Sequence, residues 1–285
     1  MAPSRVETQF GRHAAEYATS PVHAQGASLR RVLELLEAQP QWHVLDVATG
    51  AGHMAAALAP YVARVVAADL TPQMLEEARK LAAARGLENL VAVRADAAAL
   101  PFASESFDLV TCRIAAHHFA DPHAFAVEAC RVLRDGGRLA LVDNVAPDRA
   151  IFPAAAGADL ADAAASYNRF EKLRDPSHGR CLGLEEWREL LTGAGFVVTH
   201  CERLAKEMDL RPWADRMGAS AATCKRLASL LRGSAGPLRA FLAPREEDGR
   251  LHFTLHEGIV VAARPGRETV RVQAARTGRS IEGER

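Results

Sequence analysis

The chain has 285 residues, of which 49% are hydrophobic and 25% are charged, a composition typical of a soluble globular protein. Its 35 lysines and arginines equal its 35 aspartates and glutamates, so no overall charge attracts nucleic acid or an anionic membrane. No uncharged apolar stretch reaches the roughly 18 residues that span a bilayer, and the first residues lack the apolar segment of a signal peptide. We therefore expect a cytoplasmic protein with no membrane span and no nucleic-acid partner.

The cysteines and histidines show no metal-binding pattern. The five cysteines are scattered without a C-x-x-C pair, and the eleven histidines have no H-E-x-x-H spacing. We therefore expect neither a disulfide framework nor a metal site.

Strands and helices are predicted to alternate in the first half of the chain. The five expected strands lie at 43–47, 64–69, 90–96, 107–112 and 138–143, and the expected helices at 54–59, 72–85 and 122–134. The second helix is the clearest, because Pro72 suits the first helical position and Gly86 suits the end. Nearly continuous apolar strands between helices predict a parallel sheet covered on both faces, a doubly wound α/β fold.

The regular alternation of strands and helices ends after residue 147. Two helices are expected at 150–175 and 184–192, two strands at 196–201 and 251–263, and shorter helical stretches at 213–217, 221–231 and 238–242. Because roughly fifty residues are far more than a hairpin turn needs, we interpret residues 205–245 as a helical insertion. The expected domains are a helical cap (1–40), a core (41–147), a region of helices with the last two strands (148–264) and a disordered tail (265–285).

Three aspartates and a glycine turn are expected at one edge of this sheet. The first strand runs into Asp46-Val47-Ala48-Thr49-Gly50-Ala51-Gly52-His53, where glycines let the backbone approach a ligand closely. Asp69 and Asp96 end the next two expected strands, and parallel strands bring their carboxyl ends to the same edge. Asp69 can accept hydrogen bonds from ribose hydroxyls and Asp96 from an adenine amine, whereas Asp46 would repel a pyrophosphate. The pattern favours an adenosyl ligand that carries positive charge.

These residues resemble the motifs of class I S-adenosylmethionine-dependent methyltransferases. Residues 44–52 are similar to the glycine motif of that family, and Ala68-Asp69, Ala95-Asp96-Ala97 and residues 131–137 follow in the family's order. Asp135 stands where the family usually has proline. Within the class, the chain is most similar to the ubiquinone/menaquinone C-methyltransferase-like (methyltransferase type 11) group, through residues 46–53 and 112–119.

The resemblance implies a fold, a cofactor and a set of cofactor-binding residues. The fold would be a Rossmann-like, doubly wound, seven-stranded and mostly parallel sheet, with helical insertions forming a lid. The cofactor would be S-adenosyl-L-methionine, which leaves as S-adenosyl-L-homocysteine. The implied cofactor-binding residues are Asp46, Ala48, Thr49, Gly50, Ala51, Gly52, Asp69, Leu70, Met74, Asp96, Ala97, Arg113, Ala115 and Tyr17. Phe10 would close over the sulfonium together with Tyr17, because aromatic faces attract cations.

The expected activity is methyl transfer to a small, largely apolar acceptor, quinone-like or polyketide-like, at carbon or oxygen. Transfer from a sulfonium is an in-line displacement that depends on proximity and exclusion of water. The candidate catalytic residues are His118, His117 and Asp143, because a histidine is the natural base near neutral pH. The protein would be a monomer or a homodimer.

Two other functions stay open from the sequence. The pattern G-x-G-x-x-A formed by Gly50, Gly52 and Ala55 also fits an NAD-dependent oxidoreductase with Asp69 on the ribose. Asp46 and Asp96 have no role in that chemistry. The third function is an S-adenosylmethionine-binding protein that does not methylate, as a regulator or as a catalyst that uses the sulfonium's charge.

Overall fold

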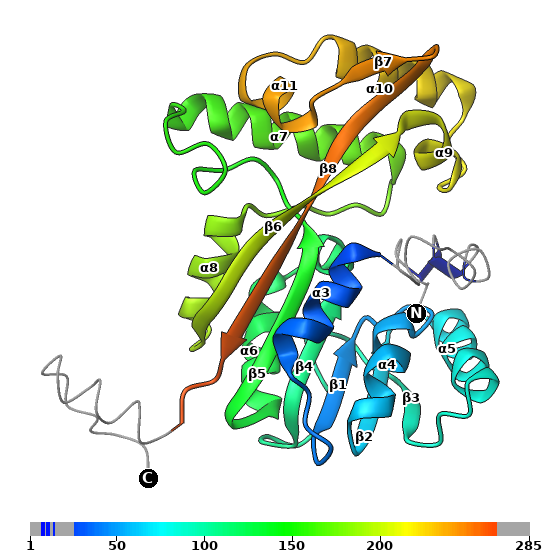
Figure 1. The fold of residues 1–285 in the computed structure, drawn as a ribbon, viewed down its shortest axis with the longest axis vertical. Coiled ribbons are helices and arrows are strands. Elements are labelled where there is room, and N and C mark those ends of the chain that lie inside the picture. The colour runs from blue at the N-terminus through cyan, green and yellow to red at the C-terminus, as the bar shows by residue number, and fades with distance from the viewer. Residues whose placement is uncertain (1–6, 9, 12–13, 15–25, 267–285) are drawn as a thin grey trace, which may run out of the picture.

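A computed structural model describes residues 7–8, 10–11, 14 and 26–266 of the chain (Figure 1). Its centre is an eight-stranded sheet in the order β3-β2-β1-β4-β5-β8-β6, with the short strand β7 paired to β8. Strands β1 to β5 run parallel to their neighbours, whereas β8 is antiparallel to β5, β6 and β7. The expected doubly wound α/β fold is confirmed, with one short strand more than the expected seven.

The elements of the first half lie close to the expected ranges. The strands are β1 (His43–Val47), β2 (Arg64–Asp69), β3 (Leu90–Arg94), β4 (Phe107–Arg113) and β5 (Leu133–Asn144), and the helices are α3 (Ala27–Leu36), α4 (His53–Leu58), α5 (Pro72–Ala84) and α6 (Pro122–Val132), with 3-10 turns η1 (Ala59–Tyr61) and η2 (Ala116–His118). β3 ends at Arg94, earlier than expected, so Asp96 lies in the turn after the strand. β5 begins at Leu133, earlier than expected, because Leu133 pairs with Phe107 before the regular ladder starts.

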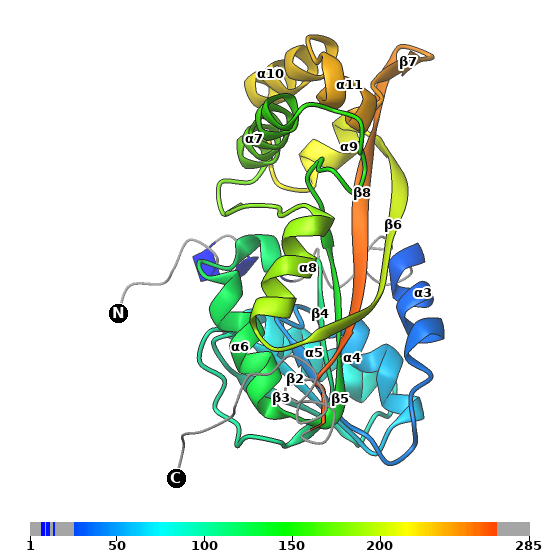
Figure 2. The same cartoon turned by 90° about the vertical axis from the view of Figure 1, so that its left-hand side faces the viewer.

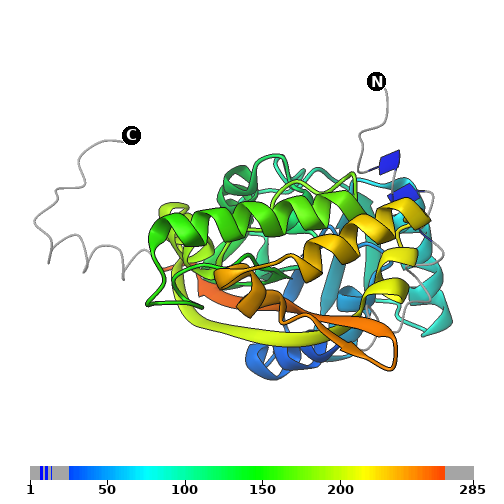
Figure 3. The same cartoon turned by 90° about the horizontal axis from the view of Figure 1, so that it is seen from above.

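Helices cover both faces of the sheet. The second half contains α7 (Gly157–Arg174), α8 (Leu184–Gly193), β6 (Val197–Asp209), α9 (Leu210–Asp215), α10 (Ala221–Arg232), α11 (Gly236–Leu242), β7 (Arg245–Glu247) and β8 (Arg250–Ala263). Figure 2 shows α6 and α8 on one face of the sheet and α3 and α4 on the other. Helix α5 packs against β2 and β3. Helices α7 and α9 to α11 lie above the carboxyl edge, where α7 runs across the top of the sheet (Figure 3). This arrangement puts a helical layer over the edge at which parallel sheets bind ligands.

The strand β6 is much longer than the sequence pattern indicates. The expected strand ended at residue 201 and the helical insertion began at 205, whereas β6 continues to Asp209 and pairs with β8 along its whole length. The residues of β6 alternate between exposed and half-buried, so they lack the apolar run of a buried strand. Their backbone N–H and C=O groups form hydrogen bonds with β8, a strand that is distant in sequence. The helices of the insertion accordingly begin at Leu210, and the two strands carry them above the sheet.

A separate apolar cluster holds this upper layer together. Three buried aromatic side chains lie at its centre: Phe170 stacks on Trp213 with ring centroids 5.1 Å apart, and Phe253 meets the two rings edge-on at 5.5 and 4.9 Å. They come from α7, α9 and β8. The upper layer therefore has its own core rather than resting on the sheet alone. Among the helices that the structure describes, none has the length and hydrophobicity needed to cross a lipid bilayer.

We predict that Phe253→Ala lowers the free energy of unfolding by about 3–5 kcal/mol, because the side chain is fully buried and its removal leaves a cavity among aromatic rings. Urea-induced unfolding followed by circular dichroism measures the change. The matched control is Leu230→Ala on α10, since Leu230 is 48% exposed and its truncation changes stability by only about 0.5 kcal/mol or less. Equal losses in the two variants would contradict a separate core in the upper layer.

Candidate functional site

A cavity of about 340 Å³ lies at the carboxyl edge of the sheet. Its walls come from the residues that follow β1, β2, β3 and β4, together with Phe10 from the N-terminal segment. Asp46, Asp69 and Asp96 all line it, as the spacing of the three aspartates predicts. Because three segments far apart in sequence converge on one hollow, this cavity is the first candidate for ligand binding.

Asp46 is the most deeply buried of the three carboxylates, at 1% exposure. The Thr49 hydroxyl donates to its Oδ2 at 2.5 Å and the Thr111 hydroxyl donates to its Oδ1 at 2.6 Å. Burial raises the pKa of Asp46 to about 6, although these two hydrogen bonds favour the charged form. The side chain thus connects β1, the glycine turn and β4 at the floor of the cavity.

The glycine turn uses its two glycines for different purposes. Gly50 has φ +55° and nothing within 4 Å of the position where a Cβ would stand, so it leaves open space beside the cavity that it lines. Gly52 has φ +84°, and a Cβ there would come within 2.9 Å of the Ala78 Cβ on α5. Gly52 is not among the residues that line the cavity, and its lack of a side chain is required by the close packing on α5. Ala48 also has positive φ, at 51°, an unusual conformation for alanine.

Asp69 holds the glycine turn against the end of β2. Its Oδ2 accepts the backbone N–H of Gly50 at 2.9 Å, and its Oδ1 accepts the backbone N–H of Thr71 at 2.8 Å. Burial raises its pKa, and the N–H groups of Thr71 and Gly50 oppose that shift. Each carboxylate oxygen has two lone pairs, so both oxygens can still accept a hydroxyl hydrogen from a ligand in the cavity.

The far end of the cavity is more open. Asp96 is exposed, and its Oδ1 accepts the backbone N–H of Ala98 at 2.9 Å, which closes the turn after β3. Leu70 and Met74 line the same end, together with Ala97. Two apolar side chains and a carboxylate at the rim suit a flat aromatic ring with an exocyclic amine.

The structure brings together most of the residues that the sequence nominates for the cofactor. Twelve of them line the cavity: Asp46, Ala48, Thr49, Gly50, Ala51, Asp69, Leu70, Met74, Asp96, Ala97, Arg113 and Ala115. Tyr17 lies outside the described residues, as do residues 267–285 of the expected tail. The sequence reasoning missed His53, Met54 and Ile114, which also line the cavity. Ile114 has φ +54°, a strained conformation for a β-branched residue, and no sequence signal reveals it.

His117 and Asp143 form a buried pair next to this cavity. The Nδ1 of His117 lies 2.6 Å from Asp143 Oδ1, and the backbone N–H of His117 donates to Asp143 Oδ2, also at 2.6 Å. A carboxylate accepts, so in the neutral ring Nδ1 carries the proton and Nε2 has the lone pair. Burial lowers the pKa of His117, but the charge and hydrogen bond of Asp143, together with the charges of Glu171 and Asp175, raise the pKa above its usual value.

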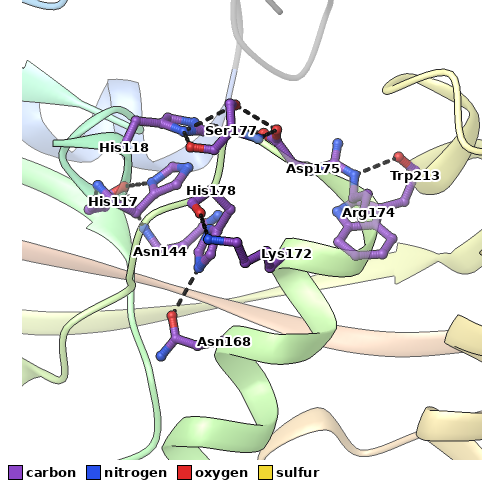
Figure 4. A network of polar contacts seen from close by, with 11 residues as sticks. His117, His118, Asn144, Asn168, Lys172, Arg174, Asp175, Ser177, His178 and Trp213 are labelled. Carbon is purple, nitrogen blue, oxygen red and sulfur yellow. Dashed lines mark hydrogen bonds and ion pairs between the residues drawn. The ribbon is translucent and has the colours of Figure 1, made fainter. Parts of the chain in front are cut away.

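His118 has the opposite electrostatic environment (Figure 4). Its Nδ1 lies 3.2 Å from the carbonyl oxygen of Ser177, and its ring contacts that of Phe10 edge-on, with centroids 4.9 Å apart. Burial and the neighbouring charge of His117 hold the pKa of His118 well below its usual value, so its ring stays neutral. His178, whose Nε2 lies 2.9 Å from Asn168 Oδ1, has its pKa lowered to about 3, first by burial and then by His117.

A second, smaller cavity of about 80 Å³ adjoins the first. Four residues line both cavities: Phe10, Arg113, Ile114 and His118. The second cavity lies between the sheet edge and the upper layer, and its other walls come from His117, Asn144, α7, α9, β6 and β8. The sequence reasoning missed Lys206, Met208, Arg216, Leu255 and Glu257 in these walls, because the extension of β6 beside β8 was not foreseen.

The comparisons with known proteins agree with this geometry. A family model described as a methyltransferase domain matches residues 45–141. The uncharacterized methyltransferase YcgJ of Bacillus subtilis is 33% identical over 233 residues, which cover 82% of this chain and 88% of that protein. A demethylmenaquinone methyltransferase of Thermus thermophilus is 43% identical over 133 residues, which cover 45% of this chain and 60% of that protein. A crystal structure from Bacillus halodurans is 36% identical with a TM-score of 0.76, and the match covers 84% of this chain and all of that one.

We predict that Asp46→Asn becomes more stable relative to the parent as the pH rises. The native carboxyl keeps a proton that the unfolded chain releases, so the parent's free energy of unfolding falls between pH 4 and its native pKa of about 6. Asparagine does not titrate, and the two threonine hydroxyls can reorient to meet it. The difference between variant and parent should therefore change by up to about 3 kcal/mol between pH 4 and pH 7. Urea unfolding at the two pH values measures it, with the exposed Asp162→Asn as control. A pH-independent difference would contradict the raised pKa.

Proposed function

The chain belongs to the class I S-adenosylmethionine-dependent methyltransferases, and we propose that it methylates a small, largely apolar molecule at carbon or oxygen. The observation that carries the proposal is the pair of adjoining cavities that share Phe10, Arg113, Ile114 and His118. A donor in the larger cavity and an acceptor in the smaller one would meet at these four residues. Family membership sets aside the NAD-dependent oxidoreductase, for which Asp46 and Asp96 had no use.

The residues of the larger cavity fit the donor. Asp69 would accept the ribose hydroxyls, Asp96 and Ala97 would meet the adenine edge, and Leu70 and Met74 would cover the adenine ring. The open space at Gly50 would let the methionine part pass close to the backbone. When bound, S-adenosylmethionine supplies an electrophilic methyl group on a positively charged sulfur. Phe10 at the junction would offer an aromatic face to that charge.

His117 is our candidate for the catalytic base, with Asp143 as its positioning residue. The sequence reasoning put His118 first, but the low pKa of His118 makes it a weak base. His117 lines the smaller cavity, keeps a lone pair on Nε2, and has a pKa raised by Asp143. It can therefore remove a proton from a hydroxyl, or from a carbon beside a ring hydroxyl, as the methyl group arrives. His118 would form the neutral wall between donor and acceptor.

The outer segments would exclude water during transfer. We propose that residues 148–264 form the acceptor pocket and its lid, and that Phe10 covers the donor. Two of the lid elements, α7 and α9, contribute Arg174 and Trp213 to the smaller cavity. Displacement at a sulfonium depends mainly on the alignment of donor and acceptor and on the exclusion of water. Such a cover would therefore supply much of the catalytic effect. The match to the menaquinone enzyme supports a ring acceptor, although it spans less than half of this chain.

Calorimetric titration with S-adenosylhomocysteine and an assay of S-adenosylmethionine turnover test the proposal. We expect binding by the parent and a loss of about tenfold to a hundredfold in affinity in Asp69→Ala, because charged hydrogen bonds to the ribose are removed. Asp162→Ala, an exposed change on α7, is the control and should bind like the parent. Turnover to S-adenosylhomocysteine should appear with hydroxylated aromatic acceptors. Absence of binding, or unchanged affinity in Asp69→Ala, would refute the assignment.

We predict an acid limb in the pH profile of kcat/KM. The base must be neutral, and the pKa of His117 is raised, so activity should rise as the pH increases through a value above 6.5. Asp143→Asn removes the charge that raises this pKa, so the limb should move to lower pH. His117→Gln should abolish the limb and lower turnover about a hundredfold or more. A profile in His117→Gln identical to that of the parent would show that His117 is not the base.

A further inference from the structure

The walls of the smaller cavity are rich in hydrogen-bond donors. Arg113, Arg174, Lys206 and Arg216 line it, against two acidic residues, Asp175 and Glu257. Each cation in such a cavity must be partly removed from water, which costs free energy unless the charge is paired. The groups that already have partners decide whether this charge is available to a ligand.

The Arg174 side chain is held in place by Trp213, and its two terminal amino groups are left to bind a ligand. It lies near the end of α7, half-buried, and its Nε donates to the backbone oxygen of Trp213 at 3.0 Å. Its guanidinium also stacks on the indole ring, with Cζ 4.4 Å from the ring centroid (Figure 4). The two terminal amino groups make no hydrogen bond within the described part of the chain. A planar, preordered guanidinium with two open donor groups suits a bidentate contact to a carboxylate or a phosphate.

Two more donors face the same cavity. The side-chain amide of Asn144, at the end of β5, has no hydrogen-bond partner among the residues that the structure describes. The ammonium group of Lys206 makes one ion pair, to Glu257 Oε1 at 3.1 Å, and has three hydrogens to donate. Both side chains are half-buried. Together with Arg174 they surround the space from α7, β5 and β6.

The acidic groups near the cavity are already occupied. Glu257 accepts from Lys206, and Asp175 accepts from the backbone N–H and the hydroxyl of Ser177 at 2.8 and 2.6 Å through one oxygen. Asp143 is engaged by His117 and by the backbone N–H of Asn144. Among the described residues, no acidic group pairs with the terminal amino groups of Arg174 or with the Asn144 amide.

We propose that the methyl acceptor carries an anionic oxygen group, a carboxylate or a phosphate, which is bound by Arg174, Asn144 and Lys206. The inference rests on the proposed function, since it assigns the smaller cavity to the acceptor. The apolar ring of such an acceptor would lie against Ile114, Met208 and Leu255, which line the same cavity. A volume of about 80 Å³ suits a compact acidic group and not a long hydrocarbon tail.

Calorimetric titrations of the protein saturated with S-adenosylhomocysteine test this inference. The probes are benzoate and phenyl phosphate, with benzamide as the neutral probe of the same shape. We expect at least one acid to bind about tenfold or more tightly than benzamide, and the stronger of the two identifies the acidic group. Arg174→Gln should remove most of this preference, and Arg174→Lys should keep part of it, because a lysine keeps the charge but not the planar fork.

The matched control is Arg169→Gln on the same helix, since Arg169 is exposed and, within residues 26–266, its side chain bonds to Ser166 alone. It should keep the full preference for the acid. All variants should bind S-adenosylhomocysteine like the parent, because none of the changed residues lines the larger cavity. Binding of S-adenosylhomocysteine by a variant also shows that the variant is folded. Equal binding of both acids and benzamide, including no binding of any probe, would overturn the inference, as would an undiminished preference in Arg174→Gln. Loss of S-adenosylhomocysteine binding by the parent would instead refute the proposed function.

Discussion

The carboxylate of Asp69 ties together two turns that follow neighbouring parallel strands. It accepts N–H groups from Gly50 after β1 and from Thr71 after β2, so the glycine turn and the start of α5 are fixed by one side chain. Gly52 then allows α4 to begin close to Ala78 of α5. The shape of the larger cavity depends on this arrangement. A residue that the sequence nominates for ligand binding therefore also builds the turn that the ligand would meet.

A role in both the turns and the cavity explains why charged side chains are buried at the carboxyl ends of β1 and β2. Asp46 and Asp69 are nearly buried, and burial raises the pKa of each. Their cost in desolvation is offset by hydroxyl and backbone N–H donors, since every oxygen has a partner. A cationic ligand beside these carboxylates would stabilise their charged forms further. The site is thus organised for positive charge before any ligand arrives.

How much could be predicted from the sequence depended on how local each signal was. The strands β1 and β2 matched the expectation, because a buried parallel strand is a short apolar run bounded by a turn. The second half of β6 was missed, since its alternating polar residues become a strand only when β8 pairs with them. Lys206 and Glu257 were missed for the same reason. The upper layer could be predicted as helical, but not where its side chains converge.

The two adjacent histidines show how one fixed charge can assign different tasks to like side chains. Asp143 contacts His117 twice and stabilises its protonated form, whereas the nearest polar group to His118 Nδ1 is the neutral carbonyl of Ser177. The rings lie 4.1 Å apart, so a charge on His117 itself disfavours a charge on His118. Only one of the pair can be protonated readily, and it is the one away from the larger cavity. A neutral His118 at the junction would avoid placing a further cation beside the proposed donor, and His117 could exchange a proton with a ligand in the smaller cavity.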